Sequence, residues 1–590
     1  MSATTETSSP TPERMAIGIS FGNTSSSIAY TNPSDGSAQV IANEEGDRQI
    51  PSILSYTGGE EFHGTQAKAQ IIRNPRNTVA FWRDFLGKGF KDVDPSPCHA
   101  SAHPIEIEGG KSVGFVVQEK VAEEEGGSEP EKSTLGVGEI ATRHLRRLKQ
   151  SASDYLGKEV NAAVITIPSD FSEESRKALE TAAKGAGIEV LQVIPEPVSA
   201  LLAHDAKVQQ NAEGSTQQDK IVLVADLGGT RSDVAVVASR GGMYTTLATA
   251  HDYELGGSSL DKVLIEYAAK EFLKKNKTAK DPRENERGLA KLTLEAENVK
   301  KALSLGATAS FSVESLSDGI DFSLSVNRTR YELLANKVFM SFTRLLESAV
   351  QKADLDVLDI DTVLLSGGTA HTPKIASNLQ SHFPESCVII SPSTIGTAVN
   401  PSELTARGAA IQASLVSEFE KSDVEENTEA VVTVTPHLHH AIGLVIASES
   451  GKESFAVIID PETPVPVRRT AQIPVPSGGN VLLRIAEGTR EIDVRKEEKP
   501  ATNGTAKDND DSDEDEDSDD EPEEVRSKVW KAGKMLAEAG IRDVKKGGKV
   551  EVQVNVAADM SVTVVAREVG GKGGVRGNLE GAKSEMNGNA

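Results

Sequence analysis

Two segments of the chain repeat the same pattern of strand, turn and strand, and this repeat constrains the fold more than any other feature. The segments are residues 16–30 and 222–237, each with a turn of small residues between two apolar runs. Ser20 and Asp226 occupy equivalent places in them. The repeat predicts that the first part of the chain folds as two similar halves.

Residues 15–418 have the sequence pattern of an α/β domain. Short runs rich in β-branched residues alternate there with longer amphipathic segments: residues 163–167 predict a strand, 172–185 a helix and 189–194 another strand. Ser172 is positioned to cap the start of that helix. Short strands separated by Pro and Gly follow in the second part of the chain, and they are typical of a β-sandwich.

Composition divides the chain into five segments. We expect a disordered tail over residues 1–14, the α/β domain over 15–418 and a polar linker over 419–435. A β-sandwich domain is expected over residues 436–568, with a disordered acidic insertion at 496–524, and a flexible tail over 569–590. No helical pattern follows Glu568, so the sequence predicts no helical lid after the β-sandwich.

Charge and cysteine content exclude several functions. The net charge is −26, and thirteen acidic residues lie between Asp508 and Glu524. A negative field disfavours wrapping of nucleic acid, so we expect no DNA binding. Two cysteines cannot make a disulfide framework, and no apolar run is long enough to cross a bilayer. The sequence therefore predicts a cytoplasmic protein without a membrane partner.

Three glycine-rich turns are candidates for binding phosphate. They contain Gly22 with Asn23 and Thr24, Gly228 with Gly229 and Thr230, and Gly367 with Gly368. Glycine admits a phosphate close to the backbone, and the backbone N–H groups of such turns converge on an anion. A single turn of this kind is more often a plain hairpin, but two of them in similar halves predict a clamp for a polyphosphate. The chain has no G-x-x-x-x-G-K-[ST] motif, which excludes a P-loop.

Seven motifs in order resemble those of the DnaK-type seventy-kilodalton heat-shock chaperones. They are residues 18–26, 164–168, 194–197, 226–229, 255–257, 297–304, and 367–368 with Pro373 and Lys374. The resemblance covers roughly residues 16–568 and implies an actin-like ATPase domain followed by a peptide-clamp domain. It implies ATP as the cofactor, bound by Gly22, Asn23, Thr24, Gly228, Gly229, Thr230, Gly256, Glu297, Lys300, Lys301, Ser304, Gly367 and Gly368.

The departures from the family pattern fall on the catalytic positions. Ser20 stands where the family has an Asp that holds the hydration shell of Mg²⁺, and Arg83 stands where it has the catalytic Lys. Thr230 and Arg231 replace a Gly and a Thr of the second turn, whereas Glu196 and Asp226 are retained. We expect Mg²⁺ to be anchored weakly, by Asp226 through water.

Phosphoryl transfer depends on the positioning and charge of several groups, so the effects of several altered groups on its rate add to one another. We expect ATP binding with little or no hydrolysis. The alternative is that the substitutions are tolerated in a working ATPase.

The altered site and the missing lid together look like the atypical Ssz-type branch of the family, a subunit of the fungal ribosome-associated complex. That resemblance implies a stable heterodimer with a J-domain protein of the zuotin type, and contact with the ribosome mainly through that partner. It also implies support of an active chaperone of the same family during nascent-chain folding. The rival interpretations are an active ATP-driven peptide chaperone, a nucleotide-exchange factor of the same superfamily, and a sugar kinase of the same fold.

Overall fold

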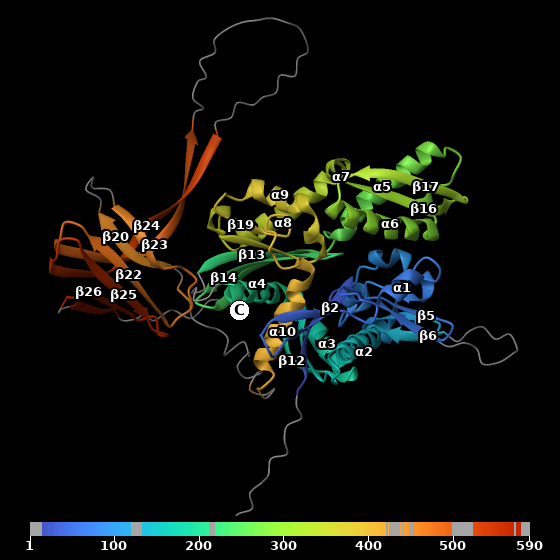
Figure 1. Cartoon of the computed structure of the whole chain (residues 1–590), viewed down its shortest axis with the longest axis horizontal. Coiled ribbons are helices and arrows are strands. Elements are labelled where there is room, and N and C mark those ends of the chain that lie inside the picture. Colours follow the sequence, from blue (N-terminus) through green and yellow to red (C-terminus); the bar gives the residue numbers. More distant parts are fainter. Residues whose placement is uncertain are drawn as a thin grey trace, which may run out of the picture. The chain divides into compact units, whose positions relative to one another are not determined.

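The computed structural model of the chain consists of two compact units, which divide between Glu429 and Ala430. Each unit is described by itself (Figure 1). The structure describes residues 14–119, 132–211, 219–419, 423, 437, 438, 440–447, 453–497, 523–571 and 574–579. Residues 1–13 of the tail predicted over 1–14, most of the predicted linker and residues 498–522 of the insertion predicted over 496–524 lie outside the described residues. The two ends of that insertion, residues 496–497 and 523–524, are strand residues and not disordered as expected.

Two sheets of matching topology form the centre of the first unit. One has the order β3-β2-β1-β11-β12 and the other β15-β14-β13-β18-β19. In each, the first three strands in sequence pair antiparallel and the last two add in parallel. The prediction of two similar halves is confirmed. The strands are β1 Ala16–Ser20, β2 Ser25–Thr31, β3 Ala38–Ile41, β11 Ala162–Ile167, β12 Glu189–Pro195, β13 Lys220–Leu227, β14 Ser232–Arg240, β15 Met243–Asp252, β18 Thr362–Ser366 and β19 Val388–Ile390.

Helices and smaller sheets surround these two sheets. The helix predicted over residues 172–185 is α3, and the Ser172 hydroxyl accepts a hydrogen bond from the N–H of Ser175 at 3.2 Å. The helices are α1 Gly64–Gln70, α2 Val137–Leu156, α3 Glu173–Gly185, α4 Glu196–Asn211, α5 Gly257–Lys275, α6 Glu286–Leu305, α7 Arg328–Leu334, α8 Asn336–Lys352, α9 Pro373–His382 and α10 Leu404–Val416. The remaining strands are β4 Ile50–Pro51, β5 Leu54–Thr57, β6 Glu60–His63, β7 Thr78–Val79, β8 Pro104–Ile107, β9 Ser112–Val117, β10 Ser133–Gly136, β16 Thr308–Ser317 and β17 Ile320–Asn327.

Helices α4 and α10 pack against each other and connect the two halves (Figure 1). Their close approach depends on Gly408, because a Cβ atom there would lie 1.8 Å from the carbonyl oxygen of Ser199. Gly18 on β1 likewise lets α10 approach the first sheet, since a Cβ atom would lie 2.1 Å from the backbone nitrogen of Ala410. Because neither glycine carries a side chain, α10 can lie in direct contact with both halves.

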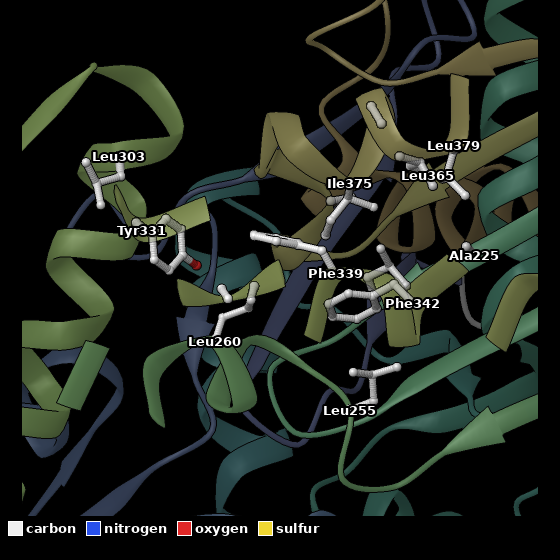
Figure 2. Packing of buried hydrophobic residues seen from close by; sticks show 14 of the residues in the cluster. Ala225, Leu255, Leu260, Leu303, Tyr331, Phe339, Phe342, Leu365, Ile375 and Leu379 are labelled. Atoms are coloured by element: carbon white, nitrogen blue, oxygen red, sulfur yellow. The ribbon is translucent and has the colours of Figure 1, made fainter. Parts of the chain in front are cut away.

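The largest apolar cluster lies in the second half of the first unit. Figure 2 shows part of it, with Phe339 and Phe342 of α8 beside Leu365 of β18 and Ile375 of α9. Both cysteines, Cys98 and Cys387, are buried and free of any disulfide. No helix in the described part of the chain is long and apolar enough to span a membrane.

The described elements of the second unit are all strands and form two four-stranded sheets, β21-β20-β23-β24 and β22-β25-β26-β27. One apolar cluster draws residues from both, including Ile442 and Ile485 from the first and Val552 and Val564 from the second. The strands are β20 Ala441–Ala447, β21 Glu453–Ile459, β22 Val467–Val475, β23 Gly479–Glu497, β24 Glu523–Val544, β25 Gly548–Val556, β26 Val562–Glu568 and β27 Gly574–Leu579.

Two of these strands differ from what the sequence indicates. Residues 525–544 lack the alternation of apolar and polar residues that predicts a strand, yet β24 pairs with β23 along its whole length, as far as Glu497 with Glu523. Strand β27 lies in the expected flexible tail and pairs with β26. Both strands are rich in Gly, Ala or charged residues, so their pairing depends on backbone hydrogen bonds to a neighbour rather than on their own strand propensity.

Candidate nucleotide site

The two glycine-rich turns of the repeat face one another. The Asn23 side-chain amide donates a hydrogen bond to the Thr230 hydroxyl at 3.1 Å, which joins the turn after β1 to the turn after β13. A Cβ atom on Gly229 would lie 2.5 Å from Cγ2 of Thr24, so this contact requires glycine. The sequence repeat thus brings together two backbone turns at the junction of the two halves.

Two further turns complete the cradle. The N–H groups of Gly257 and Ser258, at the start of α5, donate to the carbonyl oxygens of Gly228 and Gly229 at 3.0 and 2.7 Å. The Thr369 hydroxyl donates to the Gly228 carbonyl at 2.8 Å, which brings in the turn after β18. The three predicted glycine turns and the turn at Gly256 therefore lie in one place.

Gly367 is constrained twice in this cradle. Its φ is +85°, in the region that glycine adopts most easily. A Cβ atom there would also lie 2.4 Å from the carbonyl oxygen of Leu227.

Arg83 is buried at the first turn, and hydrogen bonds to three residues fix its guanidinium. Its guanidinium donates to the Phe21 carbonyl at 3.1 Å and to Glu196 at 3.3 Å, and Nε donates to Asp84 at 2.9 Å. Although burial disfavours its charged form, Asp84 and Glu196 raise the pKa of Arg83 above its ordinary value. Arg83 is thus a fixed positive charge.

Arg231 is fixed in the same way at the second turn, but its partners come from both halves. Nε and Nη2 donate to the two carboxylate oxygens of Asp233, at 2.8 and 2.5 Å. Nη2 also donates to Asp170 of the first half at 2.5 Å, and the guanidinium lies over the Tyr253 ring, 4.6 Å from its centroid. The Tyr253 hydroxyl donates to Asp170 as well. Arg231 therefore ties the two halves together.

Of the two retained acids, Glu196 is buried and Asp226 is partly buried, and neither charge is fully compensated. Burial raises the pKa of Glu196 to about 8, against the opposing effect of Arg83. Burial and the nearby Asp233 raise the pKa of Asp226 to about 6. The Ser20 hydroxyl, at the end of β1, hydrogen-bonds the Thr405 hydroxyl at 2.9 Å.

The residues predicted on α6 adjoin the cradle at the start of α5. Lys300 donates to the Gly257 carbonyl at 2.9 Å and to Asp261 at 2.7 Å, which joins α6 to the start of α5. The Ser304 hydroxyl donates back to the Lys300 carbonyl at 3.1 Å, within its own helix.

Glu297 is held by two lysines, one from each half. Lys68 of α1 lies 2.6 Å and Lys301 lies 2.7 Å from its carboxylate. Burial raises the pKa of Glu297, but the two ammonium groups outweigh burial and lower it to about 2.

Six charged or aromatic side chains of this site were missed by the sequence analysis: Lys68, Asp84, Asp170, Asp233, Tyr253 and Asp261. For Asp233 a signal existed, because the antiparallel register of the second repeat places it directly opposite Asp226. Asp170 and Tyr253 lie in loops far apart in the sequence, and only the fold brings them to Arg231.

Comparisons with known proteins assign the family. A family model described as Hsp70 protein matches residues 16–473. The chain belongs to the Hsp70 family. It is 44% identical over 563 residues, 95% of this chain and 99% of the relative, to the Saccharomyces cerevisiae protein named "Ribosome-associated complex subunit SSZ1". It is 42% identical over 568 residues, 96% of each chain, to a heat shock protein 70 homolog of Schizosaccharomyces pombe. It is 33% identical over 488 residues, 81% of this chain and 89% of the relative, to "Heat shock 70 kDa protein 14" of Danio rerio.

Hsp70 proteins generally bind ATP with Mg²⁺, but the donor groups of this chain do not fit a cation held by protein carboxylates. Mg²⁺ needs oxygen ligands in near-octahedral geometry. Both oxygens of Asp233 are bound to Arg231, and both oxygens of Asp170 are bound to Arg231 and Tyr253. Ser20 carries no charge, which leaves Asp226. In the part of the chain that the structure describes, no group of three or more metal-binding side chains is present.

Proposed function

We propose that this chain is an Hsp70-type chaperone subunit that binds ATP with little or no hydrolysis and acts on ribosomes in a stable pair with a J-domain protein of the zuotin type. In this role it supports an active Hsp70 during the folding of nascent chains. The observation that carries the proposal is the pair of buried arginines at the phosphate cradle, Arg83 and Arg231, each fixed by carboxylates. The 44% identity of the chain to a relative named as a ribosome-associated complex subunit supports the role on ribosomes.

The cradle supports nucleotide binding. Gly22, Asn23 and Thr24 would face Gly228, Gly229 and Thr230 across the phosphates, with Gly256, Gly367 and Gly368 at the neighbouring turns. Glu297, Lys300, Lys301 and Ser304 would lie on the adenosine side. Backbone N–H groups at such turns favour an anion.

The arginines oppose turnover. A guanidinium that already donates to two carboxylates cannot move freely to follow charge as it develops on a transferring phosphoryl group. Glu196 and Asp226 remain, but Arg83 stands where the family has its catalytic Lys. Proton transfer and water positioning would then lack one of their partners, which typically costs about 10²–10⁴-fold in rate.

The second unit supports docking of a partner segment. We propose that its two sheets form a β-sandwich without a helical lid, over residues 436–568 and β27, after a linker at 419–435. A sheet edge that no lid covers would accept an extended segment of a J-domain protein. Because the net charge of the chain is −26, most of the basic surface that contacts ribosomal RNA would belong to that partner.

The experiment that tests this function measures binding, turnover and assembly with the same protein. ATP at a hundredfold excess over its dissociation constant should stabilise the chain by about 2.7 kcal/mol in a thermal scan. Single-turnover decay of bound [γ-³²P]ATP should stay near background. Affinity purification of the native protein should recover a J-domain protein in equal amounts, and cosedimentation with ribosomes at moderate salt should require it.

The rival is an active ATP-driven chaperone or exchange factor. It predicts ATP decay at the rate of a working Hsp70, and ribosome-independent release of peptide on ATP addition. Either result would overturn the proposal.

A further inference from the structure

Apart from Asp226, the carboxylates around the two turns are already committed to arginines. Asp233 accepts from Arg231 with both oxygens, and Asp170 accepts from Arg231 and Tyr253. Glu196 accepts from Arg83 at 3.3 Å. A cation entering here would have to displace a guanidinium from a buried pair, which leaves two charges uncompensated.

The two guanidiniums supply positive charge at the place where the two phosphate turns meet. Arg83 contacts the first turn through the Phe21 carbonyl, and Arg231 is itself part of the second turn. Their side chains are 3% and 7% exposed, so neither can swing into solvent. Positive charge held rigidly in a dry site stabilises an anion without reorganisation.

Arg231 keeps donor capacity for a ligand. Nε and Nη2 make every hydrogen bond that the described residues offer to this side chain, and all of them go to Asp233 and Asp170. Nη1 makes no hydrogen bond to a residue that the structure describes, so its two N–H groups are left for a ligand. A guanidinium with one free edge matches a phosphate oxygen well.

From these contacts we infer that the nucleotide site binds ATP without a divalent cation, with the guanidiniums of Arg83 and Arg231 in place of the metal charge. The inference rests on the proposed function, because it concerns the same ATP site. It goes beyond that function in naming the metal-free nucleotide as the ligand.

The test is calorimetric titration of ATP into the full chain, once in excess EDTA and once in Mg²⁺. We expect dissociation constants within threefold of each other and equal thermal stabilisation by saturating ATP. A dissociation constant more than tenfold weaker in EDTA overturns the inference while leaving ATP binding intact. Absence of binding in both buffers defeats the proposed function instead, so the two failures are distinguishable.

Two variants sharpen the test. Ser20→Asp adds a carboxylate at the end of β1, and we expect ATP binding to weaken at least tenfold in EDTA and to recover in Mg²⁺. Arg231→Thr frees both oxygens of Asp233 and should produce the same dependence on Mg²⁺. Arg287→Thr removes an exposed arginine of α6 and is the matched control, with no dependence expected. If Ser20→Asp and Arg231→Thr bind ATP equally in both buffers, the arginines do not replace the metal.

Discussion

Replacing Arg231 by methionine should destabilise the first unit far more than the loss of a surface ion pair. The substitution keeps the volume but leaves Asp233, whose side chain is 6% exposed, and Asp170 without their cation. Breaking a buried pair from one side costs about 3–5 kcal/mol. We therefore expect the free energy of unfolding to fall by that amount.

The matched control is Arg283→Met. Arg283 also contacts two carboxylates, Asp281 at 2.5 Å and Glu266 at 2.6 Å, but its side chain is 30% exposed. Exposed pairs contribute about 0–1 kcal/mol, so this variant should lose no more than that. The comparison separates burial from the number of ion pairs.

Urea unfolding followed by tryptophan fluorescence measures both variants. The chain has two tryptophans, and Trp530→Phe leaves Trp82, which is fully buried in the first unit, as the single reporter. In the double variant Arg231→Met with Asp233→Asn, the repulsion between the acids is reduced. The combined loss should therefore be smaller than the sum by about 1–3 kcal/mol. Equal losses for Arg231→Met and Arg283→Met, or strict additivity in the double variant, would refute the reasoning.

Three further predictions concern stability. The folded-state pKa of His144, lowered to about 3 by burial, lies below its ordinary value, so the unfolded chain binds a proton that the native chain does not. The stability that neutral His144 contributes is therefore lost as the pH falls from about 6.5 towards 3. In urea titrations, His144→Gln should make the fall in the free energy of unfolding between pH 8 and pH 5 smaller by about 2 kcal/mol. The control His382→Gln should leave that fall unchanged. Gly408→Ala should cost about 3 kcal/mol through its clash with Ser199, whereas Gly138→Ala on α2, which meets no atom within 4 Å, should be neutral or stabilising in the same assay. Replacing residues 507–522 by a Gly/Ser linker should change stability by less than about 0.6 kcal/mol, because β23 and β24 still pair at Glu497 with Glu523; a melting temperature several degrees lower would show that the acidic run packs on the body.

Much of the fold could be predicted because the repeat carries its own topology. The strand, turn and strand pattern around Ser20 and Asp226 indicated two similar halves, and hydrophobic periodicity placed α3 and its Ser172 cap. The long pairing of β24 could not be predicted, since its Lys, Ala and Gly residues favour no strand and its partner sets its conformation.

The glycine turns of the site could be predicted from the sequence, but the network of ion pairs around Arg231 could not. Glycine turns have a local signature, so Gly229 and Gly367 were found from the sequence. Arg231 was found as a departure, but its two carboxylates and the Tyr253 ring were not, because contacts between residues 170, 231 and 253 depend on how the halves close. A buried ion pair has no local sequence signal of its own.

The two buried thiols make this chain a ready substrate for site-specific labelling. Burial raises the pKa of both Cys98 and Cys387 to about 12, so almost no thiolate exists at neutral pH and maleimides should react slowly with either. A cysteine introduced at an exposed position in each unit, such as Leu415→Cys on α10 and Leu482→Cys on β23, would then carry a fluorophore pair without removal of the native cysteines. Energy transfer between the two dyes would report the distance between the units in the presence and absence of ATP, a J-domain protein and ribosomes.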